Sequence, residues 1–477
     1  MIVYEVFIPS FSDSDHDGIG DLPGLISKLD YIQDLGATAI WISPVHPSPS
    51  YHKYDVSDYY SIDPVYGTMQ DMDKLISELH RRNMKLILDL VINHTSAEHT
   101  WFIQSASSPD NPYRDYYVWK DFHSVQDEIN KKTTTFDSDN ITQWHKWNDD
   151  KEVYYGFFWK GMPDLNFDNP KVREEVYKIG KFWLAKGIDG FRLDAARHIF
   201  PDDRFDDTRK FWEEFRTEMV TVKPDVMLVG EVWLDPVQLS TLFKGLPSLF
   251  NFELTKSIPE SINSGQPHRF MDSYTHTDTS YRKGNIPFED AVLLSNHDMN
   301  RIRSSLHGDI SKSKLAASIL LTLPGTTYLY YGEEIGMLGM KPDENNREPF
   351  LWGDGTSDTF WMKARYSVSP NVTPAASQKD DPGSIYNYYK KWIALRKQHP
   401  DMEGSKLDFI KVDDPNVLAY TLTGLTEKYM VAHNLADHQA MISAPENSEI
   451  LSGDDVVLSG NAMNLNGYSS VIFKILK

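Results

Sequence analysis

The strongest constraint on the fold is an alternation of short apolar runs with amphipathic stretches along most of the chain. Stretches such as 69–83 and 171–186 place apolar residues at helical spacing. Between such stretches, eight runs of strand length predict β-strands at 2–8, 37–42, 85–91, 188–193, 226–229, 249–252, 291–294 and 327–331. Eight strands alternating with helices form the pattern of a closed parallel barrel, so the predicted fold class is α/β, a (β/α)8 TIM barrel.

Two parts of the chain do not follow this alternation. Residues 94–168, after the third predicted strand, are rich in Asp, Asn, Ser, Tyr and Trp and show no clear helical repeat, which is typical of a functional insertion. From about residue 402, short alternating segments separated by Asp, Asn and Gly turns predict an antiparallel β-sandwich. The predicted domains are therefore a barrel in two parts (1–93 and 169–401), an inserted domain (94–168) and a C-terminal β domain (402–477).

Three predicted strands end at a carboxylate. The segments GFRLD, GEVW and SNHD lead to Asp194, Glu231 and Asp298. Burying an acid is costly unless it is paired or used in chemistry. In a barrel, the residues that end the strands meet at one face and form the active site. The sequence therefore predicts one polar site built from these three acids.

The surroundings of the three acids suggest different roles. Arg192 and Asp194 point to the same side of their strand, and a guanidinium keeps a neighbouring carboxylate ionised and able to act as a nucleophile. Glu231 follows an apolar run that would raise its pKa and suit a general acid/base. Double-displacement glycoside hydrolysis needs such a pair, with carboxyl groups about 5–5.5 Å apart. Asp298 would be an electrostatic partner to the sugar hydroxyls.

Composition narrows the possible partners. The formal net charge of −21 argues against nucleic acid or an anionic membrane surface, both of which need a positive face. The chain contains no cysteine, so disulfide and thiol chemistry are excluded. Its start reads as a strand rather than a secretory signal, and no apolar run is long enough to span a bilayer, so we expect a cytoplasmic protein.

An acidic loop near the N-terminus predicts a metal site. The segment DSDHDGIGD, residues 13–21, places carboxylates at alternate positions around a glycine turn, which collects hard oxygen ligands as an EF-hand loop does. The bidentate Glu of a full EF-hand is missing. We expect Ca²⁺ to be bound by Asp13, Asp15, Asp17, the Ile19 carbonyl and Asp21.

These segments resemble the alpha-amylase superfamily, glycoside hydrolase family 13, from one end of the chain to the other. The stretch DLVINH at 89–94, the three acid segments and MPDLN at 162–166 match the family's short signature stretches in order. The resemblance implies that Asp194 is the nucleophile, Glu231 the acid/base and Asp298 the stabiliser of the transition state. It also implies an α-glucan or malto-oligosaccharide as substrate.

The resemblance also implies a set of substrate-binding residues. They are matched by position in the family's motifs: His52, Tyr54, His94, Arg192, His297, Asp343 and Arg347. Lys53 departs from the glycine that is commoner between His52 and Tyr54, and its side chain is expected to narrow the mouth of the cleft. Relatives with a similar acidic loop bind a metal there. Asn93, Asp164 and His198 match the positions of a possible second calcium site between the barrel and the inserted domain.

Several features bear on the bond that is cut. Relatives that cut α-1,6 bonds often carry Val after the nucleophile, so Ala195 favours α-1,4 bonds. Arg197-His198 is similar to the pair of a basic residue and a His in true amylases. The MPDLN stretch and the acidic loop are instead similar to the corresponding segments of oligo-1,6-glucosidases and neopullulanases. We expect an alpha-amylase that acts on starch, maltodextrins or malto-oligosaccharides. The alternatives are a 4-alpha-glucanotransferase, an oligo-1,6-glucosidase or neopullulanase and, more remotely, a non-catalytic barrel scaffold subunit.

Overall fold

The structure is a computed structural model of residues 1–477. It describes all residues except 133, 135–137, 139, 148–150, 454–456, 460–461 and 477. None of the helices among the described residues has the length and apolar character that a membrane span needs.

Parallel strands form a closed barrel, which confirms the predicted fold class. Around the barrel the strands follow the order β1-β11-β10-β9-β8-β7-β3-β2. Each of the eight predicted strands is present with ends shifted by a few residues. For example, the first strand stops at Val6 because a 3-10 turn with Pro9 follows it. The strands span Ile2–Val6 (β1), Ala39–Ile42 (β2), Lys85–Leu90 (β3), Gly190–Leu193 (β7), Met227–Gly230 (β8), Ser248–Phe250 (β9), Glu289–Leu293 (β10) and Thr326–Tyr330 (β11).

Helices follow the strands, and local sequence sets their ends. Helix α6, Pro170–Lys186, begins where the Asn169 side chain accepts a hydrogen bond from the Lys171 backbone N–H, and ends at Gly187 with φ of 109°. Outside the long connection after β3, the other helices of six residues or more are α1 Leu22–Ser27, α2 Leu29–Leu35, α3 Met69–Arg81, α7 Phe205–Val220, α9 Phe252–Ser264, α10 His268–Arg282, α12 Ile310–Thr322 and α15 Ile385–Gln398. Shorter helices are α8 Pro236–Leu239, α11 Ile302–Ser305, α13 Asp343–Asn346 and α14 Ala375–Lys379.

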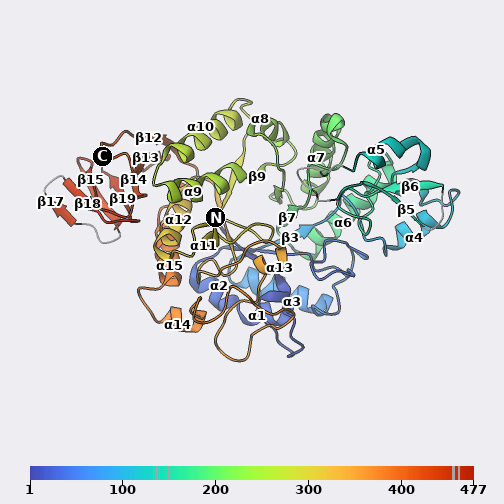
Figure 1. Ribbon diagram of the computed structural model, residues 1–477, viewed down its shortest axis with the longest axis horizontal. Coiled ribbons are helices and arrows are strands. Elements are labelled where there is room, and N and C mark those ends of the chain that lie inside the picture. The colour runs from blue at the N-terminus through green and yellow to red at the C-terminus, as the bar shows by residue number, and fades with distance from the viewer. Residues whose placement is uncertain are drawn as a thin grey trace. The chain divides into compact units, whose positions relative to one another are not determined.

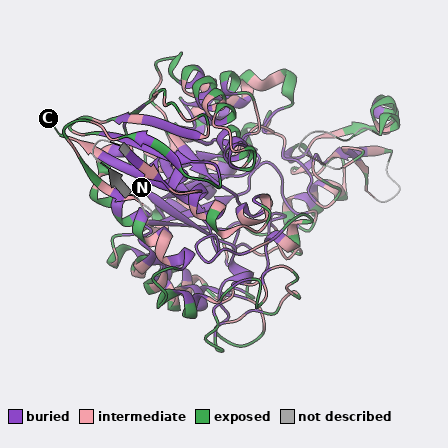
Figure 2. Ribbon diagram, turned by 60° about the vertical axis from the view of Figure 1, so that its left-hand side comes forward, coloured by how far each residue is buried: buried purple, intermediate pink, exposed green. Residues whose placement is uncertain are grey.

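Two compact units make up the chain. The first contains Met1–Ile40, Arg81–Met84 and Phe250–Lys477, and the second contains Trp41–His80 and Lys85–Leu249. In both, most residues of the barrel strands are buried (Figure 2), although β10 begins with the exposed Glu289. The domain boundaries expected from the sequence stay a prediction.

The long connection after β3, within the second unit, has secondary structure of its own. Strands β4 (Trp119–Asp121), β5 (Trp144–Lys146) and β6 (Glu152–Tyr155) form an antiparallel sheet in the order β4-β6-β5, and the connection also contains helices α4 (Thr100–Ser107) and α5 (Gln126–Lys131) (Figure 1). The sequence showed no clear helical repeat in this connection, and its two helices were not predicted. Each helix is too short to show a clear period in the sequence.

The C-terminal strands, within the first unit, form two antiparallel sheets that share a hydrophobic core. One has the order β12-β13-β14-β19-β16 and the other β15-β18-β17. Side chains from both sheets, including Val417, Ala440 and Leu465, form this core, as expected for a sandwich. The strands span Lys406–Phe409 (β12), Val417–Thr423 (β13), Lys428–Asn434 (β14), Ala440–Ser443 (β15), Ser448–Gly453 (β16), Val457–Ser459 (β17), Ala462–Leu465 (β18) and Ser470–Ile475 (β19).

A buried hydrogen-bond network joins the five-stranded sheet to helix α12. His433 Nε2 lies 3.0 Å from the Tyr420 hydroxyl, and His433 Nδ1 lies 2.7 Å from Ser470 Oγ. Thr322 and Ser318 of α12 continue the network at 2.7 Å from Tyr420 and Ser470, respectively. Burial lowers the pKa of His433 to about 3, so its ring is neutral at ordinary pH.

This network predicts a loss of stability in acid. Because the pKa of His433 is lower in the folded than in the unfolded protein, only the unfolded state binds the proton as the pH falls below about 6.5. Between pH 7 and pH 5 this linkage should lower the free energy of unfolding by about 2 kcal/mol. His433→Asn should reduce the pH-dependent loss by this amount in denaturant titrations. The same substitution at exposed His276 should not, and equal pH dependence of both variants would contradict the prediction.

Candidate active site

In the second unit, strand register brings Asp194 and Glu231 to the ends of neighbouring strands. β7 pairs with β8 so that Leu193 lies opposite Gly230, and each acid comes directly after that pair. On the other side of β7, Arg192 lies opposite Asp89 of β3. Three adjacent parallel strands therefore place three carboxylates and one guanidinium at their carboxyl ends.

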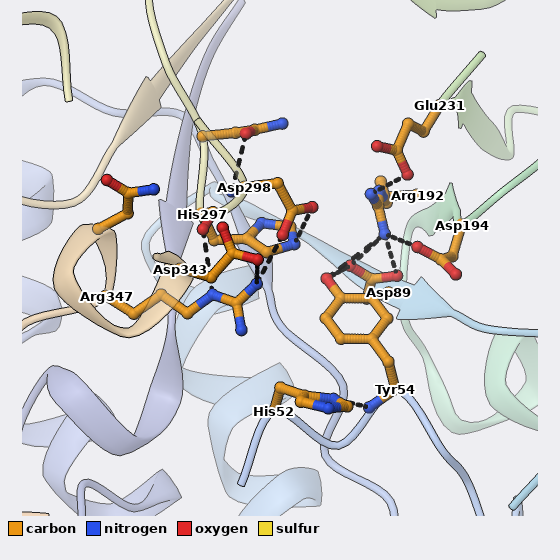
Figure 3. Close-up of polar contacts among 12 residues, drawn as sticks. His52, Tyr54, Asp89, Arg192, Asp194, Glu231, His297, Asp298, Asp343 and Arg347 are labelled. Atoms are coloured by element: carbon orange, nitrogen blue, oxygen red, sulfur yellow. Dashed lines mark hydrogen bonds and ion pairs between the residues drawn. The ribbon is translucent and has the colours of Figure 1, made fainter. Parts of the chain in front are cut away.

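The Arg192 side chain contacts all three acids (Figure 3). Its Nη1 donates to Asp89 at 2.9 Å and to Asp194 Oδ1 at 2.7 Å, while its Nη2 donates to Glu231 Oε2. Arg192 and Asp89 are fully buried. Burial alone would lower the pKa of Arg192, but the Asp89 and Glu231 carboxylates outweigh it and raise that pKa well above its usual value. The guanidinium is thus a permanent positive charge within the group of acids.

Glu231 differs from expectation in its surroundings. The sequence predicts an apolar setting, but the carboxylate contacts the Arg192 guanidinium, and its Oε1 accepts a hydrogen bond from Trp233 Nε1 at 3.2 Å. This difference arises because β7, which carries Arg192, pairs with β8 and so lies beside Glu231. The apolar run before Glu231 packs within the barrel instead, where Leu228 and Val229 are buried.

Tyr54, His52 and His94 lie in the same unit. The Tyr54 hydroxyl donates to Asp89 Oδ2 at 3.0 Å, which connects Tyr54 to the Arg192 group (Figure 3). His52 Nδ1 accepts a hydrogen bond from the Tyr54 backbone N–H at 3.1 Å, and His94 Nε2 lies 3.0 Å from the Tyr54 carbonyl oxygen. Burial lowers the pKa of His94 to about 4, so this ring is neutral and can serve as a hydrogen-bond donor.

Lys53 does not point where the sequence suggested. Its φ of 66° lies in the left-handed region that favours glycine, which explains why glycine is commoner at this position. The side chain is buried, and its Nζ lies 2.7 Å from Asp63 Oδ2. It is therefore held by an internal ion pair, and the expectation that it narrows a cleft mouth was wrong.

In the first unit, a second group of charges surrounds Asp298. Arg347 Nη2 donates to Asp298 Oδ1 at 2.6 Å, and His297 Nε2 lies 2.9 Å from Asp298 Oδ2 (Figure 3). Arg347 directly follows helix α13, whose first residue, Asp343, has its Oδ2 3.6 Å from Arg347 Nη2. Lys341 also contacts the Asp343 carboxylate. Four of the residues predicted from the sequence thus form one cluster.

The acidic loop brings together three of its predicted ligands. Ligand oxygens of Asp13, Asp15 and Asp21 all lie within 4.8 Å of one another, the only such group of His, Cys, Asp or Glu found in the described part of the chain. Asp17 is not in the group, and its Oδ1 accepts the Ile19 backbone N–H at 2.8 Å. The chemistry of three converging carboxylates fits a hard cation.

The predicted second calcium position has a different character. The side chains of Asn93 and Asp164 lie 3.4 Å apart, whereas the His198 ring stacks on Phe157 with centroids 4.1 Å apart. Burial raises the pKa of Asp164 to about 8, so its carboxyl group can remain protonated and neutral at this place. Calcium binding by these three residues stays a prediction.

Comparison with known proteins identifies the family. Residues 5–404 match the family model for the alpha amylase catalytic domain. The chain belongs to the alpha-amylase family. It is therefore an enzyme of a family of glycoside hydrolases and related transferases, as the signature stretches indicated.

Relatives of this enzyme have different activities in their names. "Alpha-amylase 3" of Dictyoglomus thermophilum is 46% identical over 99% of this chain and 93% of its own length. A 4-alpha-glucanotransferase of Thermotoga maritima is 33% identical over 92% of this chain and 97% of its own length. The crystal structure of an alpha-amylase from H. orenii superposes with a TM-score of 0.92 at 40% identity and covers 99% of both chains.

Two buried acids of these charge groups were not expected from the sequence. Asp89 contacts Arg192 in the second unit, and Glu5 of β1 contacts His297 in the first. Both are charged residues inside otherwise apolar strands, at positions that point into a buried region. This signal was present in the sequence, because a charge in a buried strand needs a partner.

The buried Asp89–Arg192 ion pair predicts that a conservative substitution of Asp89 strongly lowers the stability of the fold. Asp89→Asn should lower the free energy of unfolding by about 3 kcal/mol, because removing one partner leaves a buried charge with less compensation. The matched control is Asp30→Asn, which removes an ion pair of 2.7 Å to Arg82 from a carboxylate that is 84% exposed. There we expect a loss of under about 1 kcal/mol. Chemical denaturation measures both, and losses of similar size would contradict this account.

Proposed function

We propose that the enzyme hydrolyses α-1,4-glucosidic bonds in starch, maltodextrins or malto-oligosaccharides with retention of configuration. Asp194 attacks the sugar carbon and forms a covalent glycosyl-enzyme, and Glu231 first protonates the leaving oxygen and then activates water. Asp298 stabilises the positive charge of the transition state. This proposal includes the assembly of Asp194, Glu231 and Asp298 around one glucosyl ring.

The observation that carries the proposal is the bridging of Asp194 and Glu231 by one guanidinium. Because Arg192 Nη1 contacts one carboxylate and Nη2 the other, the two carboxyl groups lie within the reach of a single side chain. Retaining enzymes need carboxyl groups about 5–5.5 Å apart, and a shared guanidinium partner is compatible with that separation. The Arg192 charge also favours the ionised form of Asp194, which a nucleophile requires.

The remaining predicted residues would hold the sugar. We assign Tyr54 to stacking on the ring, and His52, His94, His297, Asp343 and Arg347 to hydrogen bonds with its hydroxyls. The neutral ring of His94 suits an uncharged substrate, because no charge has to be desolvated on either side. Ala195 and the 46% identity to a protein named alpha-amylase favour α-1,4 bonds over α-1,6 bonds.

A 4-alpha-glucanotransferase is the nearest alternative, supported by the relative of that name. Both activities share the covalent intermediate and differ in whether water or a sugar accepts the glycosyl group. Timed product analysis on maltotriose separates them, with isomaltose and pullulan as controls for α-1,6 cleavage. We expect glucose and maltose to accumulate from the start. Early appearance of maltotetraose and longer products would favour the transferase, and faster cleavage of isomaltose would favour an oligo-1,6-glucosidase.

We also propose that the acidic loop binds Ca²⁺ through Asp13, Asp15 and Asp21, with Asp17 and the Ile19 carbonyl as further ligands. Three carboxylates this close repel one another unless a cation lies among them. Asp13 already accepts backbone N–H bonds from Asp15, His16 and Gly18, which orients its oxygens within the loop. The ion would stabilise the loop and takes no part in the reaction.

Calcium binding predicts that a substitution in the acidic loop lowers thermal stability only when calcium is present. Asp15→Ala should lower the melting temperature in the presence of calcium and change it little in the presence of a chelator, because the substitution removes a ligand. Asp110→Ala, a change at another exposed acid, should have no effect in either medium. Calorimetric scans measure the difference, and an equal loss for Asp15→Ala in both media would rule out the ion.

A further inference from the structure

Strand β1 carries one acid into the buried part of the first unit. All five residues of Ile2–Val6 are buried, and Glu5 is only 3% exposed. Its Oε1 lies 2.6 Å from His297 Nδ1 and also accepts the His297 backbone N–H at 3.3 Å. A buried carboxylate is costly unless it is paired, and the His297 ring is the partner that this geometry provides.

The other nitrogen of the same ring also contacts a carboxylate. His297 Nε2 lies 2.9 Å from Asp298 Oδ2. An ionised carboxylate can only accept hydrogen bonds, so a ring between two of them satisfies both contacts only when both nitrogens carry a proton. With both carboxylates ionised, this geometry requires the imidazolium form of His297.

A second cation, Arg347, lies beside the His297–Asp298 pair. Arg347 donates to Asp298 Oδ1 at 2.6 Å and, through its Nε, to the His297 carbonyl oxygen at 3.0 Å. Burial raises the pKa of Glu333, which follows β11, to about 8. It also raises the pKa of Tyr330, the last residue of β11, well above its usual value. Glu5, Asp298, His297 and Arg347 thus form a set with balanced charge.

The pKa of the ring agrees with this geometry. Burial alone would lower the pKa of His297, but the Asp298 and Glu5 carboxylates outweigh it and raise the pKa to about 10. Buried histidines without such partners behave in the opposite way, since burial lowers the pKa of His433 to about 3.

We propose that Glu5 is a positioning residue that holds His297 as an imidazolium and fixes its Nε2–H toward Asp298. The charge state of His297 follows from these contacts and the ionised form of both carboxylates. Its consequence for catalysis rests on the proposed function: a charged donor beside Asp298 orients that carboxylate and offers a charge-assisted hydrogen bond to the sugar held there. Glu5 acts through His297 and does not contact the substrate.

The direct test is the protonation of His297 in the full-length enzyme. Histidine labelled with ¹⁵N is followed by NMR from pH 6 to pH 9, and the His297 signals are assigned by their loss in His297→Asn. In the wild type, both ring nitrogens should stay protonated up to at least pH 8.5. In Glu5→Gln, whose amide oxygen can still accept from Nδ1, the pKa of His297 should fall by at least two units. A neutral ring in the wild type at pH 7 overturns the proposal, whatever the variant does.

The control and the kinetic readout separate positioning from a merely structural role. Glu334→Gln is the matched control. Glu334 is also buried, but its carboxylate accepts hydrogen bonds from the Tyr4 and Tyr31 hydroxyls instead of contacting His297. It should leave the His297 titration unchanged. In Glu5→Gln, the alkaline limb of kcat/KM should move at least one pH unit toward acid, and Glu5→Asp should restore part of the shift. A uniform loss of activity with an unchanged His297 titration overturns the proposal.

The outcome for Glu5 is distinguishable from that for the proposed function. The NMR titration needs no substrate, so a His297 that titrates as expected in an enzyme without activity on α-glucans contradicts the function and supports the role of Glu5 in setting the charge. An active α-1,4-hydrolase whose His297 is neutral contradicts the Glu5 proposal and leaves the function standing.

Discussion

The buried guanidinium of Arg192 is the interaction on which the second unit's site depends. Side chains from three neighbouring strands contact it: Asp89 on β3 and, at the ends of β7 and β8, Asp194 and Glu231. A lone buried charge would be strongly unfavourable, and so would three buried or half-buried acids without a cation. The guanidinium compensates part of the charge of the three acids, and the barrel register supplies the geometry of these contacts.

In the first unit, different residues stabilise the acids. Asp298 has two cationic neighbours, His297 and Arg347, and Glu5 in turn lies against the far side of His297. In both groups an acid that is proposed to face the substrate is held by a cation, and that cation is held by a second acid inside a strand. Asp89 and Glu5 are these inner acids. Rigid strands therefore position the outer acids, which favours electrostatic preorganisation.

The sequence predicted the barrel strands well, for physical reasons. Buried parallel strands appear as apolar runs, and acids that interrupt them at the end are conspicuous. Pairing across strands is not encoded locally, so the contact of Arg192 with Glu231 and the pairing of Glu5 with His297 could not be read from single segments. The short helices α4 and α5 were missed because a few turns give no clear period. Lys53 was misjudged because its backbone conformation and its partner Asp63 depend on the tertiary fold.

The most direct test of the central claim is to trap the glycosyl-enzyme. A fluorinated α-glucosyl fluoride that forms the intermediate rapidly and releases it slowly should label one residue, and peptide mass mapping identifies it. The account predicts a single glucosyl adduct on Asp194, formed in the wild type and absent in Asp194→Asn. A stable adduct on Glu231, on Asp298 or on any other side chain would contradict the assignment of Asp194 as the nucleophile oriented by Arg192.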